Sequence, residues 1–528
     1  MRAGSLRPKI PVLGTGAGPV SSAPVPSPSP LLVLRYSPLA LLTLAVALVA
    51  IAPQRSVADS LTVAEADTLA PRPRSQSAQL GAIVDEILAD PDLPSAFWGL
   101  HITDLSTGER ILERNADKLF LPASTMKLLT TATALDALGP DHRYATRLYH
   151  FGETTANGTM RGDLVIRGTG DPTFGSSGIT GEPLERWAEA LAQAGVRRFE
   201  GRIIGDDDRF ADAAYAEGWD VTHVGVESYA PPAGGLAWND NVLAVRFRDG
   251  SPTVDPPGLV EFVEDVASQR NGGGRLRVSR VLGTNQIRLS GTVPAGYSGT
   301  VVFPVENPTL YAVAAFADAL REAGIAVSAD LADVDEVRDA PSYDAADPIR
   351  AYVSPTLDQI IRRINRESDN HYAEQVFRSL SASGSTEASA GRVEQLLRDA
   401  GADVTGLSIA DGSGLSRKDL ITPQAMGALL AHMHTHRHAR AFRQSLPQGG
   451  GAGSTLRSRL GGVPVRAKTG SLQAVRALAG YVDGPQGQPI AFVLFANNYS
   501  TRSYRITQAF DRIVRALASG ERPPADEE

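Results

Sequence analysis

Three short, widely separated strings in this chain supply side chains that together could transfer an acyl group. They are Ser124–Lys127 (STMK), Ser368–Asn370 (SDN) and Lys468–Gly470 (KTG). A serine hydroxyl can attack a carbonyl when a lysine that has lost its proton serves as its base. The second string adds another hydroxyl and an amide, and the third adds a positive charge. Each string alone is weak evidence, so the hypothesis depends on all three meeting in one site.

Ser124 is the candidate nucleophile, and Lys127 is its candidate general base. The pattern predicts a helix from about residue 124 to 138 that begins at Ser124. Free backbone N–H groups and the helix dipole favour developing negative charge there, and Lys127 lies one turn later on the same face. The backbone N–H of Ser124, paired with that of Ser471, would form an oxyanion hole. The alternative is a helix-capping serine followed by a solvated lysine, the commoner use of this string when it stands alone.

Ser368 and Asn370 follow a helix that is predicted over residues 356–366. The Ser368 hydroxyl could relay a proton to a leaving amine. The Asn370 amide has both a donor and an acceptor with which to hold a substrate peptide bond. The alternative is a polar turn without a chemical role.

The third string continues to Ser471 and is expected at the end of a strand. Lys468 could hold a substrate carboxylate and lower the pKa of Lys127. Thr469 and Ser471 are further candidates for contact with the substrate. Gly470 would let a ligand approach the backbone closely, so that a substrate could add as an extra strand at this edge. The alternative is a charged residue before a β-bulge.

Composition narrows the class of protein. The chain has 528 residues, enough for roughly three domains. Its apolar residues make up 42% and its charged residues 21% of the chain, which is ordinary for a globular protein. The net charge of −8 argues against a nucleic-acid partner. The absence of cysteine excludes a thiol nucleophile, a cysteine-ligated zinc and a lipid-modified N-terminal cysteine.

The elements that must position these residues fall into three parts. Residues 78–140 predict a helix, a β-hairpin and the Ser124 helix, as the first part of a catalytic domain. Residues 141–345 consist mostly of short β-rich runs and predict one inserted domain or two nested ones. Residues 346–520 predict several helices, three strands and a closing helix. The expected fold is therefore α+β, an antiparallel sheet flanked by helices plus a helical lobe, interrupted by mostly β inserted domains.

The two ends of the chain read differently from the rest. Residues 1–58 predict a signal peptide, with a Pro- and Ser-rich n-region, an apolar run over 39–52 and small residues before Asp59. The protein is then expected to be periplasmic or otherwise extracytoplasmic. An uncleaved anchor is the alternative, although the apolar run is short for a membrane span. The acidic, proline-containing tail 521–528 predicts disorder.

The spacing of the three strings resembles that of a known family. Ser368 lies 244 residues after Ser124, and Lys468 lies 100 residues after Ser368. In class A β-lactamases the first two motifs lie much closer together. The chain resembles instead the class C low-molecular-mass penicillin-binding proteins, which are D-alanyl-D-alanine carboxypeptidases/endopeptidases with a domain inserted between these motifs.

Three further strings support this resemblance. The string Asp411–Arg417 resembles the glycine-rich loop of that family, and Gly168–Thr173 and Gly205–Phe210 resemble signatures of its insert. The resemblance runs from about Gln79 to Gly520 and implies a penicillin-binding, transpeptidase-like fold for the catalytic domain.

The resemblance also implies an activity. Ser124 would attack the penultimate D-alanine carbonyl of a peptidoglycan stem peptide, at a D-Ala-D-Ala terminus or a D-Ala–meso-diaminopimelate cross-link. β-Lactams would acylate Ser124, and no cofactor or metal would be needed. The family brings an aspartate of the insert towards the site, for which Asp220 is the match, and Arg417 is a further candidate for substrate binding. An ordinary surface ion pair is the alternative for Asp220 and Arg417.

Two other functions compete with this one. A β-lactamase or esterase could share the fold, although the long insert argues against it. A catalytically silent protein that binds the cell wall could also keep the fold. The intact motif residues argue against the second alternative. The sequence separately leaves open a peripheral association with the membrane or the cell wall.

The histidines outside the motifs are expected to be uninvolved. His371 follows the second string and is expected to face solvent. His432 and His436 would share a helix face and could bind a metal. No carboxylate partner is evident near them in the sequence, so a metal site is not predicted there.

Overall fold

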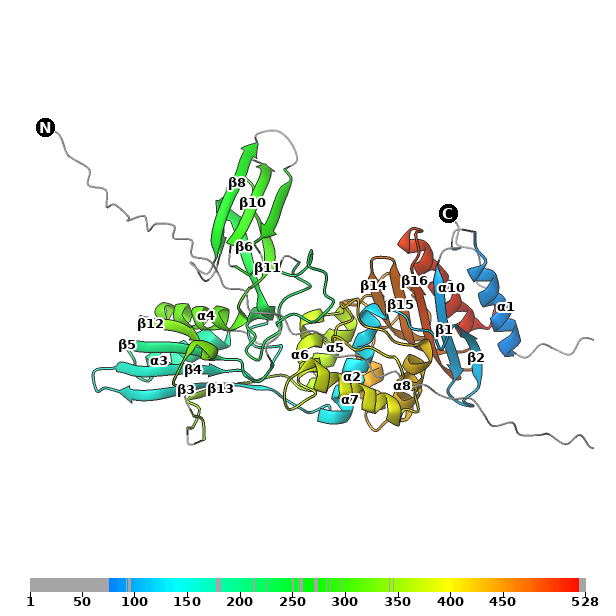
Figure 1. Ribbon diagram of the computed structural model, residues 1–528, viewed down its shortest axis with the longest axis horizontal. Coiled ribbons are helices and arrows are strands. Elements are labelled where there is room, and N and C mark those ends of the chain that lie inside the picture. Colours follow the sequence, from blue (N-terminus) through cyan, green and yellow to red (C-terminus); the bar gives the residue numbers. More distant parts are fainter. Residues whose placement is uncertain are drawn as a thin grey trace, which may run out of the picture. The chain divides into compact units, whose positions relative to one another are not determined.

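A computed structural model describes residues 76–521 (Figure 1), apart from 92, 94–95, 177–181, 212–213, 226, 249–250, 255, 257–259, 270–273, 282, 285, 295, 341 and 345. The predicted signal peptide and nearly all of the predicted disordered tail lie outside the described residues. Among the described helices, none combines the length and apolar character that crossing a bilayer requires.

A five-stranded antiparallel sheet carries the third motif. Its strands follow the order β14-β15-β16-β1-β2. Their bounds are β1 Phe97–Asp104, β2 Arg110–Arg114, β14 Val465–Leu472, β15 Val475–Asp483 and β16 Pro489–Asn497. The two central strands β15 and β16 are apolar at almost every position, because residues on both faces of the sheet are buried. The strand β14 lies at one edge.

Different helices cover the two faces of this sheet (Figure 1). Helices α1 (Gln76–Leu88) and α10 (Ser503–Ser519) pack against one face, where Phe492 and Leu494 of β16 join the core. The alternate residues Val493 and Phe495 face the opposite side and pack into the helical lobe. The period of two in a strand assigns neighbouring residues to these two separate cores.

The helical lobe surrounds α2 (Met126–Leu138). It contains α5 Leu357–Glu367, α6 Asn370–Arg378, α7 Thr386–Asp399, α8 Pro423–Thr435 and α9 Ala439–Ser445. Residues 126–135 of α2 are all buried, because neighbouring helices and the sheet enclose it. Apart from Lys127, its buried residues are accordingly apolar or small on every face rather than on one stripe. This position holds the Ser124 end of α2 in the centre of the molecule.

The segment between α2 and α5 forms three sheets. The largest has the order β12-β5-β4-β3-β13, in which β4 pairs in parallel with β5 and β5 with β12. Its strands are β3 Ala145–Thr154, β4 Thr159–Arg167, β5 Arg198–Asp206, β12 Ala326–Asp333 and β13 Arg350–Val353, with the helices α3 Pro183–Gln193 and α4 Pro308–Glu322. Since β13 pairs with β3, this sheet extends beyond the expected limit at residue 345.

Two three-stranded sheets complete the inserted segment. One has the order β11-β6-β7 and the other β8-β10-β9. Their strands are β6 Val242–Arg248, β7 Ser251–Val254, β8 Glu261–Gln269, β9 Leu276–Arg280, β10 Gln286–Pro294 and β11 Gly299–Pro304. The α+β class expected from the sequence is confirmed, with β-rich sheets interrupting a helix-and-sheet catalytic part.

Candidate active site

Ser124 lies in a 3₁₀ turn over Ala123–Thr125, and the α-helix α2 begins only at Met126. The expectation that Ser124 begins an α-helix is therefore wrong by one short turn. Ala123 has a positive φ of 47°, which an alanine adopts only under constraint. Two glycines allow close packing here: a Cβ on Gly414 would lie 1.9 Å from the Ala123 carbonyl oxygen, and one on Gly470 would lie 2.8 Å from that of Pro122.

Lys127 reaches Ser124 from the first turn of α2. Its Nζ donates to Ser124 Oγ at 3.1 Å, to Asn370 Oδ1 at 2.6 Å and to the Ser413 carbonyl at 2.5 Å. Burial of this fully enclosed side chain lowers the pKa of Lys127 to about 8, while the charge of Asp411 opposes that shift most strongly. Roughly one molecule in ten would then hold a neutral Lys127 amine at pH 7. A neutral amine at this distance can accept the Ser124 proton.

Lys468 is also fully buried, and it contacts the second motif. Its Nζ donates to Ser368 Oγ at 2.9 Å and to the Thr469 carbonyl at 2.8 Å. Burial, together with the nearby Lys127 charge, lowers the pKa of Lys468 well below its usual range. We expected the Lys468 charge to help lower the pKa of Lys127. Burial is the main cause, and repulsion between the two ammonium groups acts beside it.

Ser368 and Asn370 stand on either side of a helix break. Ser368 ends α5 in the left-handed conformation, with φ of 65°, and Asp369 caps the start of α6 by accepting from the Tyr372 N–H. The Asn370 amide is engaged at both ends: its oxygen accepts from Lys127, and its Nδ2 donates to the Tyr229 carbonyl at 2.8 Å. One Nδ2 hydrogen is used by the Tyr229 carbonyl, and the second remains for a substrate peptide bond.

The third motif lies inside β14, not at the end of a strand as expected. The Ala467 N–H donates to the Pro447 carbonyl, on the side of β14 that faces away from β15. Backbone groups alternate in direction along a strand, so those of Thr469 and Ser471 point towards the same open edge. The Ser471 N–H is thereby directed to where a ligand strand or an oxyanion would lie.

A cavity of about 630 Å³ unites these groups. Ser124, Ser368, Asn370, Thr469 and Ser471 all line it. Lys127 and Lys468 lie beneath its wall and contact it through the two serines. The structure therefore brings together all the residues that the three strings proposed.

Asp220 and Arg417 line the same cavity. Asp220 accepts hydrogen bonds from the backbone and side chain of Thr222, which lower the pKa of its carboxyl group. The exposed Arg417 side chain lies near the Gln473 carbonyl, with an Nη2–O distance of 3.4 Å. Neither residue forms an ion pair within the part of the chain that the structure describes, so the surface ion pair that we considered as the alternative is not seen.

Sequence reasoning missed the residues that hold the glycine-rich loop in place. The buried Asp411 carboxylate accepts from the backbone N–H groups of Ser413, Gly414, Leu415 and Ser416 and from Trp219 Nε1. An aspartate before a glycine-rich run is a sequence signal for such a loop. The Trp219 contact could not be found that way, because it joins residues that lie 192 positions apart.

Arg363 was also missed, and it ties the second motif to the inserted segment. Its guanidinium pairs with Asp369 at 2.8 Å and with Asp240 at 2.9 Å, and it donates to Ser176 and Tyr372. The guanidinium also lies 4.1 Å from the centre of the Tyr372 ring. Asp240 and Ser176 belong to the insert, so a single side chain couples the insert to the helix break at Ser368–Asn370.

Two expectations about histidines are wrong. His371 is not solvent-facing: it is 4% exposed, and burial lowers its pKa. It sits in the first turn of α6, whose buried face was not evident from the motif. The histidine tract does have a carboxylate partner, because His436 Nε2 lies 3.2 Å from Asp136 Oδ1. The partner was missed because it lies 300 residues earlier in the chain.

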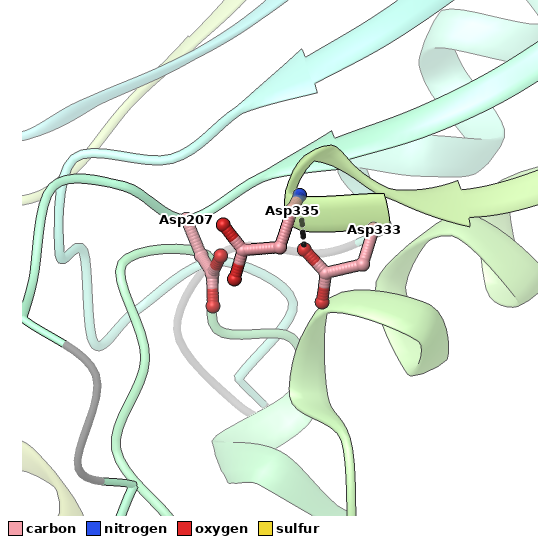
Figure 2. Close-up of side chains that lie close together, drawn as sticks. All are labelled: Asp207, Asp333 and Asp335. Atoms are coloured by element: carbon pink, nitrogen blue, oxygen red, sulfur yellow. Dashed lines mark hydrogen bonds between the residues drawn. The ribbon is translucent and has the colours of Figure 1, made fainter. Parts of the chain in front are cut away.

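One carboxylate cluster could offer oxygen ligands to a metal ion, and it lies outside the cavity. Figure 2 shows Asp207, Asp333 and Asp335 with their side chains directed towards one another, and their ligand atoms lie within 4.8 Å of one another. Burial and the nearby Asp333 charge raise the pKa of Asp207 to about 6. Asp333 also accepts from Asn307 Nδ2, at 3.2 Å. None of these groups contacts Ser124 or Lys127, so the acyl-transfer geometry does not involve this cluster.

Comparisons with known proteins agree with this geometry. The sequence model of the D-Ala-D-Ala carboxypeptidase 3 (S13) family matches residues 80–517. A D-alanyl-D-alanine carboxypeptidase of Actinomadura sp. (strain R39) is 31% identical over 444 residues, covering 79% of this chain and 80% of that protein. The D-alanyl-D-alanine carboxypeptidase DacB of Haemophilus influenzae is 25% identical over 423 residues, covering 76% of this chain and 86% of that protein.

A solved structure shares the fold. The crystal structure of penicillin-binding protein 4 from Haemophilus influenzae superposes with a TM-score of 0.70 at 24% identity, covering 82% of this chain and 99% of that one. The same protein in complex with a β-lactam gives a TM-score of 0.67 at 23% identity, with the same two coverages. These matches extend across both the catalytic part and the inserted segment.

Proposed function

Because this chain belongs to the D-Ala-D-Ala carboxypeptidase 3 (S13) family, we propose that the cavity at Ser124 is where it cleaves D-Ala-D-Ala peptides. The family resemblance expected from the motifs is confirmed, and the chain is a serine D,D-peptidase that acts on peptidoglycan. We infer the roles of the individual residues from the geometry of the site. The observation that carries them is the 3.1 Å contact between Lys127 Nζ and Ser124 Oγ.

Acylation begins at Ser124. The neutral Lys127 amine takes the hydroxyl proton as Ser124 Oγ bonds to the carbonyl carbon of the penultimate D-alanine. The backbone N–H groups of Ser124 and Ser471 donate to the oxyanion that forms. As the C–N bond breaks, the Ser368 hydroxyl passes a proton to the departing amine, and the proton that Lys127 took from Ser124 replaces it, so that Lys127 is neutral again. Water then attacks the acyl-Ser124 ester, and Lys127 again serves as base.

Lys468 binds the terminal carboxylate of the substrate. It is buried without an ion-pair partner among the described residues, and burial together with the nearby Lys127 charge disfavours its protonated form. A substrate carboxylate would supply that partner and favour the protonated form. The terminal carboxylate of a D-Ala-D-Ala peptide is the group of the right charge. Protonated Lys468 also donates to Ser368 and so keeps the relaying hydroxyl oriented.

The far end of the cavity selects the stem peptide. Asp220 offers a carboxylate and Arg417 a guanidinium in the same wall. A zwitterionic group satisfies both, and the free end of a meso-diaminopimelate residue has that chemistry. Thr469 binds the substrate through its backbone, because its side-chain hydroxyl already donates to Thr455 at 2.8 Å. The Asn370 amide holds the substrate peptide bond through its second Nδ2 hydrogen.

The proposal extends to inhibitors and to location. A β-lactam presents a strained amide and a carboxylate to Ser124 and Lys468, so it would leave a slowly hydrolysed acyl-enzyme. An apolar N-terminal run followed by small residues supports export and an extracytoplasmic site of action, where peptidoglycan lies. Association with the cell wall would follow from substrate binding alone.

The test is release of D-alanine from a stem pentapeptide that carries meso-diaminopimelate. The wild-type protein should release it, and Ser124→Ala should not. A cross-linked muropeptide dimer measures endopeptidase activity in parallel. Fast, multiple-turnover hydrolysis of nitrocefin without D-alanine release would favour the β-lactamase alternative. Sacculus binding without either reaction would identify a catalytically silent protein and overturn the proposal.

A further inference from the structure

A second pocket, at the other end of α2, collects positive charge without any neutralising partner. Its volume is about 250 Å³, and Arg143, Arg147 and Arg209 line it. In the part of the chain that the structure describes, none of the three forms an ion pair. Clustered guanidinium groups repel one another, so an unoccupied arrangement of this kind is electrostatically unfavourable.

Backbone carbonyls hold the arginines in place but leave their charge intact. Arg209 donates to the carbonyls of Ser379 and Ser381, and Arg143 donates to that of Ser354 at 2.7 Å. Carbonyl contacts fix a guanidinium without cancelling its charge, and each guanidinium has five N–H donors. Donors therefore remain for a ligand that enters the pocket.

Hydroxyl groups complete the lining. The Tyr144 side chain is 4% exposed, and its buried hydroxyl has the Ser379 side chain as its hydrogen-bond partner. Thr169 and Ser379 also line the pocket, and Ser379 Oγ already donates to the Gln375 carbonyl. The Tyr144 hydroxyl is therefore held by Ser379, and the three arginines are the donors that a ligand would use.

We propose that this pocket binds the phosphate group of a small ligand or of a phosphodiester chain. A tetrahedral oxyanion accepts from several donors at once, and the planar guanidinium matches it in bidentate geometry. The nearby Asp171 carboxyl affects Tyr144 but does not line the pocket, and it accepts from Thr173 instead. His142 adds a ring nitrogen whose pKa burial lowers, so the arginines carry the charge.

The pocket also joins two parts of the fold. Leu138 ends α2, Arg147 lies on β3 of the insert, and Ser379 follows α6 of the helical lobe. A bound phosphate would bridge the insert to the catalytic helices at a point far along α2 from Ser124. Binding at this site is therefore expected to raise thermal stability without blocking acylation of Ser124.

The test uses the purified protein and inorganic phosphate, by calorimetric titration at constant ionic strength. Saturable one-site binding and an upward shift of the melting temperature are expected. Arg143→Gln and Arg147→Gln should each weaken binding by about tenfold or more, in line with the strength of charge-assisted bonds to phosphate. Tyr144→Phe should weaken it less. Penicillin acylation should stay at the wild-type rate in all three variants.

The matched control is Arg197→Gln. Arg197 is exposed, donates only to the carbonyls of Ala192 and Val196, and does not line the pocket, so phosphate affinity should be unchanged. Acetate should bind much more weakly than phosphate. Glycerol 3-phosphate and diethyl phosphate then distinguish a monoester from a diester source. Lack of saturable binding, equal affinity for acetate, or unchanged affinity in folded Arg143→Gln and Arg147→Gln proteins would overturn the proposal.

Discussion

Lys127 and Lys468 are both completely buried, yet their surroundings differ. Carboxylates surround Lys127, among them Asp411, Asp369 and Glu374, and their charges partly offset its burial. No carboxylate among the described residues offsets the burial of Lys468 in this way, and Lys127 repels it. The difference assigns the two lysines different tasks. The first exchanges a proton near neutral pH, and the second waits for a negative charge that the substrate brings.

Removing the Lys127 amine should cause the largest loss of activity. Lys127→Met keeps most of the side-chain volume but leaves Ser124 without a base. The rate of acylation by benzylpenicillin should fall by about 10³-fold, the usual contribution of a positioned base. Stopped-flow measurement with a fluorescent penicillin would give the rate. Lys118→Met is the matched control, since Lys118 is exposed and pairs only with Asp117. A near-wild-type rate in Lys127→Met would exclude Lys127 as the base.

Removing the Lys468 amine tests whether Lys468 binds the substrate carboxylate. Lys468→Ala should lower kcat/KM for a peptide with a free terminal carboxylate by about 10²-fold, since losing one partner of a buried charge pair costs on the order of 3 kcal/mol. An amidated peptide should lose much less, because it lacks the charge that Lys468 is proposed to hold. Equal losses for both peptides would contradict the carboxylate-binding role.

The pH profile of acylation should report Lys127. Because burial lowers the pKa of Lys127 to about 8, the neutral base becomes more abundant as pH rises towards that value. The acylation rate should therefore rise on the order of tenfold per unit well below pH 8 and level off above it. A profile that falls over this range, or one without a rise, would mean that another group limits the reaction.

Arg363 should matter less than either lysine, because it acts through Asp369. Arg363→Ala should reduce kcat by roughly tenfold through misplacement of Ser368 and Asn370. Arg363→Lys restores one positive charge but not all four contacts, so it should recover only part of that loss. Steady-state kinetics beside thermal melting separates positioning from stability. A drop in melting temperature with an unchanged kcat would show that Arg363 only supports the fold.

Features that depend on local sequence patterns could be predicted, whereas contacts between distant segments could not. The three strings, their order and their spacing identified the family, because each is a local pattern with its own chemistry. The α+β class and the β-rich insert followed from periodicity. The burial of His371 and the contact of Trp219 with Asp411 depend on how distant segments pack, and no local pattern encodes that.

The dominant effect of burial on the pKa of Lys127 could not be predicted for the same reason, because it depends on how distant segments pack. The sequence places two lysines in one site, which indicated that repulsion between them helps to lower the pKa of Lys127. The carboxylates around Lys127 come from residues 369, 374, 411 and 419, which the fold brings to α2. Desolvation outweighs all of them, and desolvation depends on the complete helical lobe.

The role of Ser124 as the nucleophile is tested most directly by peptide-mapped mass spectrometry of the protein after incubation with benzylpenicillin. A single penicilloyl group per chain is expected, located on the peptide that contains Ser124, and none is expected on Ser124→Ala. An adduct on another residue, or an adduct that persists in Ser124→Ala, would contradict that role.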